Sequence, residues 1–316
     1  MKKILFISVI LLLIILYAFY SPLTEKQYIY GSSVKIAFIA DYHSGTIYYE
    51  SLIEKLEKAA AEKRVDLILL GGDILDDEES ITGAVKLFES LNSGILKNIP
   101  KFYVTGNHEF WSSKINDYKK IVKNYNIVVL DKKSPSFFIT VNNKNILISG
   151  LDDPYVIKYD DTGRYIKKEY PADWQNQWVD EYLKDFTSIK KVTENINNIE
   201  DYKKIDWLNN IIHTNINEKE IENSYKMLLS HRPEFAEIYK NLPYDYILSG
   251  HTHGGQVAIP FILNGIYAPN QGFFPKYAGG SYNIAENKYM IVSRGISFNK
   301  RLLRIFNRPE LVWLYI

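Results

Sequence analysis

Two pairs of metal-type residues stand two positions apart in this chain. Asp41 and His43 follow the apolar run KIAFIA, and His251 and His253 follow the run YILSG. Because side chains at positions i and i+2 of an extended chain project to the same side, the two residues of each pair should face the same place. Carboxylate oxygen and imidazole nitrogen suit Mn²⁺, Fe and Zn²⁺. The two pairs therefore predict metal-binding chemistry.

Three further polar groups follow other short apolar runs. GGD ends at Asp73, the segment TGNHE contains Asn107 and His108, and His231 follows the run MLLS. Any single Asp in such a place is usually a turn or cap residue. Here, however, five of the six His residues occupy such places, which chance would rarely produce. Only His213 falls outside the pattern, and we interpret it as non-functional.

The apolar runs predict the elements that would position these side chains. Short runs bounded by Gly, Pro or polar residues are typical of strands, and apolar residues three or four apart are typical of amphipathic helices. The expected strands are 35–40, 67–70, 102–104, 146–149, 227–229 and 246–248, and the expected helices are 49–63, 83–96 and 114–124. This alternation predicts an α/β fold. Because ligands of open α/β sheets bind beyond the carboxyl ends of the strands, the polar groups should meet there. Runs at 289–293 and 311–316 predict more strands and a second sheet.

Composition and missing motifs exclude several classes of function. The chain has 316 residues, 46% hydrophobic and 24% charged, with 38 Lys and Arg against 37 Asp and Glu. A net charge of +1 favours no nucleic-acid partner. With no Cys there is no disulfide, thiolate zinc site or cysteine nucleophile. The absence of G-x-S-x-G, Walker and Rossmann motifs removes serine-hydrolase, NTPase and dinucleotide-binding functions.

Taken together, the motifs resemble those of the calcineurin-like metallophosphoesterases. The order DxH, GGD, GNHE, H and GHTHGGQ is similar to that family from about Val34 to the end of the chain. The segments SRG at 293–295 and RIFNRPEL at 304–311 are most similar to a branch of bacterial membrane-anchored phosphoesterases. The resemblance implies two facing mixed β-sheets flanked by helices, an α/β/β/α sandwich.

The resemblance also implies a centre of two divalent metal ions, Mn, Fe or Zn. The ligands that it implies are Asp41, His43 and His253 for one ion, Asn107, His231 and His251 for the other, and Asp73 between them. A carboxylate has two oxygens and can bridge, whereas an imidazole or an amide oxygen serves one ion. His108 would be the acid that protonates the leaving oxygen.

The implied activity is hydrolysis of phosphomonoesters or phosphodiesters, with lipid and pyrophosphate bonds among the candidates, by a hydroxide that bridges the two metals. Two alternatives remain at this point. One is a catalytically inert metal-binding scaffold on the same fold, which a missing ligand or a missing His108 would favour; none is missing. The other is a protein phosphatase, which differs only in substrate. No obligate protein partner is evident.

An uncharged run from Ile4 to Tyr20 predicts a membrane anchor. Its seventeen residues reach the short end of the length that spans a bilayer. A cleaved signal peptide is the alternative, but the apolar run is long for one and lacks a clear small-x-small cleavage site. Lys2 and Lys3 precede the run, which by the positive-inside rule leaves the amino end in the cytoplasm. We expect a single-pass cell-membrane protein with an anchor at 1–21, a polar tether at 22–33 and an extracytoplasmic catalytic domain at 34–316.

An aromatic-rich segment at about 154–205 is expected to be an insert in that domain. Trp174, Trp178, Tyr182 and Phe186 fall four apart and would share one helix face. One interpretation is an additional helix that packs this face on the core. The other is a lid over the metals that favours a lipid-like substrate.

Overall fold

Two mixed β-sheets form the centre of the fold. The computed structural model describes the chain outside residues 1, 161, 167–168, 184–201, 214–215 and 298–302. Over the described residues each large sheet has six strands. The first sheet has the order β1 (Thr24–Ile29), β14 (Glu310–Tyr315), β2 (Lys35–Ile39), β3 (Leu67–Gly71), β4 (Lys101–Val104) and β5 (Val128–Val129). The run from β2 to β5 is parallel, so these strands share one carboxyl edge.

The second sheet mirrors this arrangement. Its order is β12 (Gly280–Ala285), β13 (Lys288–Val292), β9 (Tyr246–Ser249), β8 (Tyr225–Ser230), β7 (Lys144–Leu151) and β6 (Ser136–Val141). The four strands from β13 to β7 are parallel, and antiparallel strands close both edges. A separate small hairpin joins β10 (Tyr267–Ala268) to β11 (Gly272–Phe273).

Strand alternation builds the core on both faces of each sheet. In β2, Ile36 and Phe38 point to the second sheet, whereas Ala37 and Ile39 point to the helices. Side chains from both sheets fill the space between them, among them Phe102 and Ile148. Runs that are apolar at every position are expected for strands covered on both sides.

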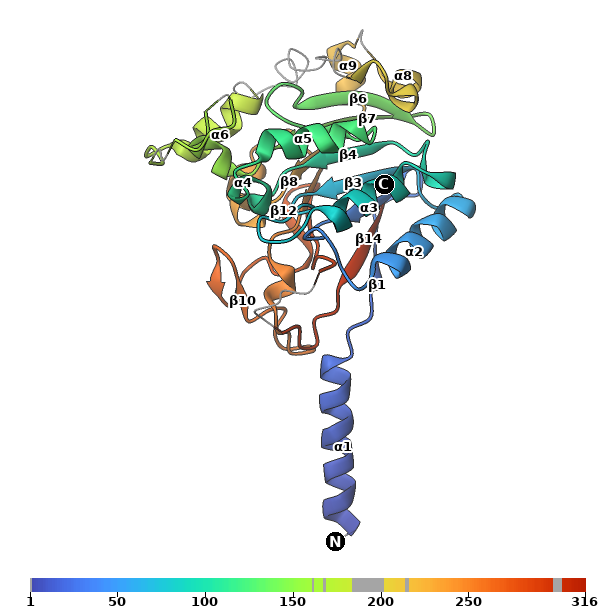
Figure 1. Ribbon diagram of the computed structural model, residues 1–316, viewed down its shortest axis with the longest axis vertical. Helices are drawn as coiled ribbons and strands as arrows, with labels where there is room; N and C mark the ends of the chain where they lie inside the picture. The colour runs from blue at the N-terminus through green and yellow to red at the C-terminus, as the bar shows by residue number, and fades with distance from the viewer. Residues whose placement is uncertain (1, 161, 167–168, 184–201, 214–215, 298–302) are drawn as a thin grey trace.

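Helices cover the two outer faces (Figure 1). The first sheet is covered by α2 (Tyr49–Ala61), α3 (Thr82–Leu91) and α5 (Ile115–Asn124), and the second by α6 (Trp174–Leu183), α9 (Glu218–Glu222) and α10 (Ala236–Tyr239). The remaining elements are α4 (Asn107–Trp111), α8 (Asp206–Ile211), η1 (Gly94–Leu96), η2 (Pro154–Lys158), η4 (Pro233–Phe235) and η5 (His253–Gly255). The prediction of two facing mixed sheets flanked by helices is confirmed.

The amino-terminal part differs from the expectation. Helix α1 (Lys2–Phe19) extends away from the domain (Figure 1). Among the described residues, no helix combines the length and the apolar character needed to cross a bilayer. The expected tether at 22–33 instead contains β1, which pairs in parallel with β14 at the edge of the first sheet. Its sequence TEKQYI is polar because edge strands commonly carry charged residues on their exposed positions.

The described part of the insert packs on the second sheet. Trp178 and Tyr182 are fully buried there, and Trp178 Nε1 donates a hydrogen bond to the Asp152 carbonyl oxygen at 2.9 Å. Trp174 is half-buried and packs edge-on against Phe235. The first interpretation, a helix packed on the core, therefore describes this helix. Phe186 lies outside the described residues.

Candidate metal centre and active site

The side chains singled out in the sequence come together where parallel strands end. Asp41 follows β2, Asp73 follows β3, Asn107 and His108 follow β4, His231 follows β8, and His251 and His253 follow β9. Because both sheets present their carboxyl edges here, ligands from the two halves of the fold meet at one place. His213 lies elsewhere, where its Nε2 is 2.6 Å from Thr140 Oγ1.

Five of these residues have a left-handed backbone. The φ angles are 52° at Asp41, 51° at His43, 51° at Asp73, 72° at His251 and 47° at His253. Such a conformation is costly for residues other than glycine and persists only where the surroundings enforce it. The sharp turns aim side chains from adjoining positions at a common point, which an extended chain could not do.

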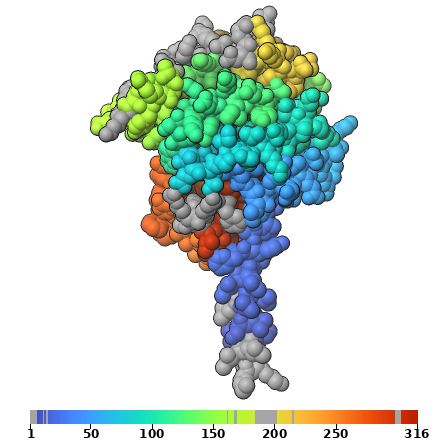
Figure 2. Space-filling model, viewed as in Figure 1, coloured from blue at the N-terminus to red at the C-terminus, as the bar shows by residue number. Residues whose placement is uncertain are grey.

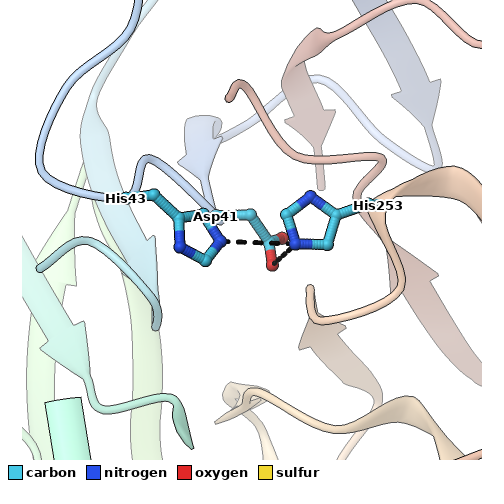
Figure 3. A group of neighbouring side chains, drawn as sticks. All are labelled: Asp41, His43 and His253. Atoms are coloured by element: carbon cyan, nitrogen blue, oxygen red, sulfur yellow. Dashed lines mark hydrogen bonds and ion pairs between the residues drawn. The ribbon is translucent and has the colours of Figure 1, made fainter. Parts of the chain in front are cut away.

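One cluster joins Asp41, His43 and His253 (Figure 3). His43 Nε2 and His253 Nε2 are 3.3 Å apart, and His253 Nε2 is 3.7 Å from Asp41 Oδ1. One ligand atom from each residue lies within 4.8 Å of the others. Three such atoms, converging from two sheets at this spacing, fit a single divalent ion.

A second cluster joins Asp73, His231 and His251 within the same 4.8 Å limit. His231 Nε2 is 2.9 Å from Asp73 Oδ2. Asn107 adds a buried amide oxygen that has no hydrogen-bond partner in the described part of the chain. A buried acceptor without a partner is costly unless something binds it, and a cation would. The donor set thus fits a second ion.

Asp73 belongs to the second cluster and also faces the first. Its Oδ2 atom is 2.9 Å from His231 Nε2 on one side and 4.0 Å from His43 Nε2 on the other. The other oxygen, Oδ1, accepts a hydrogen bond from the His108 backbone N–H at 2.9 Å. A carboxylate in this place can serve both clusters.

Two glycines are required for the clusters to close. A Cβ atom on Gly106 would lie 2.2 Å from Asp73 Oδ1, and one on Gly250 would lie 2.6 Å from Asp41 Oδ2. Both distances are shorter than any real carbon–oxygen contact. The GNHE and GHTHGGQ motifs therefore need glycine at these positions to admit the carboxylates.

Hydrogen bonds on the far side of the rings fix which nitrogen faces the centre. His43 Nδ1 donates to Asp76 Oδ2 at 2.7 Å, and His231 Nδ1 donates to the Gly71 carbonyl oxygen at 2.7 Å. His251 Nε2 donates to Asn270 Oδ1 at 3.0 Å. Such partners orient metal-binding imidazoles. They leave Nε2 of His43 and His231 and Nδ1 of His251 free to bind an ion.

The electrostatics of the clusters favour cations. Burial alone would raise the pKa of Asp73, but His231 and His108 hold it well below its usual range. Burial would lower the pKa of His231, yet the Asp73 carboxylate raises it to about 10. Burial likewise acts to raise the pKa of Asp76, and the hydrogen bond from His43 lowers it to about 2. These carboxylates are ionised at neutral pH and pull positive charge into the site.

His108 borders the open side of the centre. Its Nδ1 atom is 2.5 Å from Asp77 Oδ1 and 3.4 Å from Asp76 Oδ2. Its ring meets that of His43 edge-on with centroids 4.5 Å apart. His108 also lines a pocket of about 530 Å³ that includes Asp73, His251 and His253. This volume suits a small-molecule substrate.

Sequence reasoning missed four residues that support the centre. Asp76 and Asp77 orient His43 and His108, and Asn270 orients His251. Glu109 accepts backbone hydrogen bonds from the loops after β3 and β4. The acidic run at 76–79, directly after GGD, was the available signal for the first two. Nothing in the sequence pattern singles out Asn270.

Comparison with known proteins places the chain in a family. The family model described as calcineurin-like phosphoesterase matches residues 34–255, and the chain belongs to this family. The description of that family is that of a phosphoesterase.

Three relatives illustrate the likeness. Phosphodiesterase YaeI of Escherichia coli is 24% identical over 89% of this chain and 81% of its own length. A metallophosphoesterase of Campylobacter jejuni is 26% identical over 89% of this chain and 58% of its own length. A bovine "transmembrane protein with metallophosphoesterase domain" is 22% identical over 90% of this chain and 53% of its own length. The chain spans about half the length of the Caenorhabditis elegans, Campylobacter and bovine relatives.

Proposed function

We propose that this protein hydrolyses phosphate esters with two divalent ions, Mn, Fe or Zn. The observation that carries the proposal is the pair of adjoining three-residue clusters, one of which contains Asp73, each with ligand atoms within 4.8 Å. One ion would be held by Asp41, His43 and His253, the other by Asn107, His231 and His251, with Asp73 shared. When bound, such ions activate water for attack on phosphorus and neutralise charge on the phosphoryl oxygens.

The remaining roles fall to residues of the pocket. His108 stands at its wall and belongs to neither of these two clusters, although it forms a third group with His43 and Asp76. At the pocket wall its ring would reach the leaving oxygen of a bound ester. Asp77 accepts a hydrogen bond from Nδ1 of His108. This contact leaves Nε2 as the atom that would deliver the proton to the leaving oxygen.

Metal titration of the full chain, followed by an activity screen, tests the proposal. The chelated protein should bind two ions per chain and recover hydrolysis of p-nitrophenyl phosphate or bis-p-nitrophenyl phosphate when Mn²⁺, Fe²⁺ or Zn²⁺ is returned. Nucleotides and lipid pyrophosphates extend the screen. His213→Ala is the matched control, because His213 lies outside the site. Binding of a single ion with full activity would contradict the dinuclear centre.

We also propose that α1 holds the protein in the cell membrane, with its amino end in the cytoplasm and the catalytic domain outside. Several of its apolar side chains are exposed, among them Leu13 and Leu16. Lys2 and Lys3 precede the apolar run, and the bovine relative carries the word transmembrane in its name. A reporter fused after Ile316 should be active only outside the cytoplasm. The protein should leave the membrane in detergent but not in high salt.

A further inference from the structure

A cluster of solvent-exposed apolar side chains lies on loops at one end of the domain. Phe261, Ile262, Phe273, Phe274 and Leu303 are between 65% and 109% exposed. We call these five residues the apolar loop patch. Single exposed apolar residues are ordinary, but several large ones on neighbouring loops mark an interaction surface.

Backbone contacts connect the patch to α1. The turn that carries Phe261 is closed by a hydrogen bond between Ile259 and Leu263. Val257, before this turn, forms an isolated bridge with Ile305, and the next residue, Phe306, donates its N–H to the Ala18 carbonyl oxygen at 2.9 Å. The loop therefore stands beside the carboxyl end of α1, and Figure 2 shows the two regions in contact.

The β10–β11 hairpin adds the second half of the patch. Its Phe274 N–H donates to the Ile266 carbonyl oxygen at 2.7 Å, which joins the hairpin to the 259–266 loop. The rings of Tyr267 and Phe273 are 5.5 Å apart. Figure 1 shows β10 at the same end of the domain as α1. Both loops thus present aromatic side chains at the end from which the apolar helix projects.

The junction between α1 and the domain carries side chains typical of a membrane interface. The Arg308 guanidinium lies over the rings of Tyr17 and Tyr20, 4.9 and 5.6 Å from their centroids. Tyrosine and arginine concentrate where hydrocarbon gives way to lipid headgroups. If α1 is embedded, the headgroup level lies at this junction, and the patch beside it meets the same surface.

We propose that the apolar loop patch docks on the lipid bilayer and holds the metal pocket against phosphate esters of membrane lipids. The proposal rests on the membrane attachment proposed above for α1. A bilayer suits the patch better than a protein because the apolar surface continues from the loops onto an exposed apolar helix. A second copy of the chain is the alternative occupant, and the experiment separates the two.

The hairpin itself ties the patch to the substrate. Pro269, in the turn between β10 and β11, lines the 530 Å³ pocket. Its neighbour Asn270 accepts the hydrogen bond from His251 Nε2. When Phe273 enters the interface, the pocket wall formed by Pro269 lies close to the lipid headgroups. The substrate class that this arrangement serves is a phosphate ester held at the membrane surface.

The absence of Cys from the chain gives a direct test. Phe273→Cys is labelled with an environment-sensitive fluorophore, and the full-length protein is reconstituted into vesicles of phosphatidylcholine and phosphatidylglycerol with brominated acyl chains. Lys219→Cys, exposed on α9 at the opposite end of the domain, is the matched control. The label at position 273 should shift to the blue and be quenched by bromine, and the label at 219 should do neither.

The rate of turnover is the second measurement. The double variant Phe273→Ser, Phe274→Ser should lose roughly tenfold or more of its rate on vesicle-borne lipid phosphate, since transfer of one such side chain from water is worth about a factor of ten. Its rate on soluble p-nitrophenyl phosphate should stay at the wild-type value. Equal losses on both substrates would overturn the proposal.

Two further outcomes would also overturn it. Quenching at neither position, or equally at both, would mean that the patch does not face lipid. A disulfide between two Phe273→Cys chains, formed in detergent and blocking the lipid quenching, would identify a second copy as the occupant. The quenching needs no metal and no turnover. If the label at 273 is quenched but no phosphate ester is hydrolysed, only the proposed function fails.

Discussion

Glu109 is buried and connects the loop after β3 to the loop after β4. Its carboxylate accepts backbone hydrogen bonds from Asp73, Ile74 and Leu75 after β3 and from Gly106 after β4, at 2.8 to 3.0 Å. Those loops carry the shared carboxylate and the Asn107 amide. The side chain therefore holds two parts of the metal centre in register without facing an ion.

Glu109→Gln changes this contact with little change of shape. The amide has one oxygen, so about two of the four N–H groups would face an NH₂ group instead of an acceptor. An unsatisfied buried donor costs about 1–3 kcal/mol, which gives a loss of about 2–6 kcal/mol. At about 2 °C per kcal/mol for a chain of this size, the melting temperature should fall by roughly 4–12 °C. Metal affinity should fall about 10- to 100-fold, as is usual when a supporting partner of the ligands is lost.

The comparison is best made above neutral pH. Burial, together with the Asp73 charge, raises the pKa of Glu109 to about 7. Below that pH the wild-type carboxyl group is protonated and resembles the amide, so the difference between the two proteins should shrink. Above it the carboxylate accepts all four bonds and the full loss appears.

Calorimetric unfolding and metal titration of the full chain measure the two effects. Glu57→Gln is the matched control, because Glu57 is exposed on α2. A melting temperature and metal affinity equal to those of the wild type would refute the reasoning. A lower melting temperature with unchanged metal affinity would limit Glu109 to a role in folding.

Four other changes follow from the site and the packing. Asp73→Asn should lose most bound metal and nearly all turnover, because an amide cannot bridge two cations; metal analysis and a rate assay check this. His108→Ala should keep its metals but lose roughly 10²- to 10⁴-fold in kcat, less for substrates with good leaving groups, as a leaving-group series will show. Trp178→Ala should lower the free energy of unfolding by about 3–5 kcal/mol and should lower turnover of micellar and soluble substrates alike. Trp174→Ala should lower the free energy of unfolding by less, and denaturant unfolding measures both values. Burial lowers the pKa of Lys101 to about 7. Between pH 7 and the ordinary lysine pKa, the unfolded chain therefore binds more protons than the folded chain, and this residue makes the free energy of unfolding rise by up to about 1.4 kcal/mol per pH unit. Lys101→Met should remove that pH dependence.

Much of the site was accessible from sequence because of where parallel strands end. Each ligand follows an apolar run directly, so the position of Asp41 or His231 follows once the run is recognised as a strand. The glycines of the motifs also reflect the close approach of these loops, since a side chain at Gly106 would collide with Asp73. Residue type and position therefore indicated the candidate ligands, and their division between two ions came from the resemblance to the family.

The supporting residues were not accessible because their partners depend on loop conformation. Asp76 reaches His43 only because the backbone turns into the left-handed region at Asp73. Asn270 reaches His251 from a hairpin nineteen positions away. Strand β1 was missed for another reason, since an edge strand needs no apolar alternation and its TEKQYI sequence reads as polar linker.

The β10–β11 hairpin connects exposed aromatic side chains to the candidate metal site. Asn270 accepts hydrogen bonds from both His251 and the Arg232 Nη1 atom, so its position in the turn is held by the metal centre on one side. Phe273 and Phe274 follow a few residues along, and their side chains are mostly exposed to solvent. A contact that fixes these two rings at a bilayer would therefore fix the turn as well, and with it the imidazole that Asn270 orients. Under the proposals above, membrane docking and the alignment of the candidate ligand His251 would be coupled through fewer than five residues of chain, which would connect the exposed aromatic rings directly to the proposed site of hydrolysis.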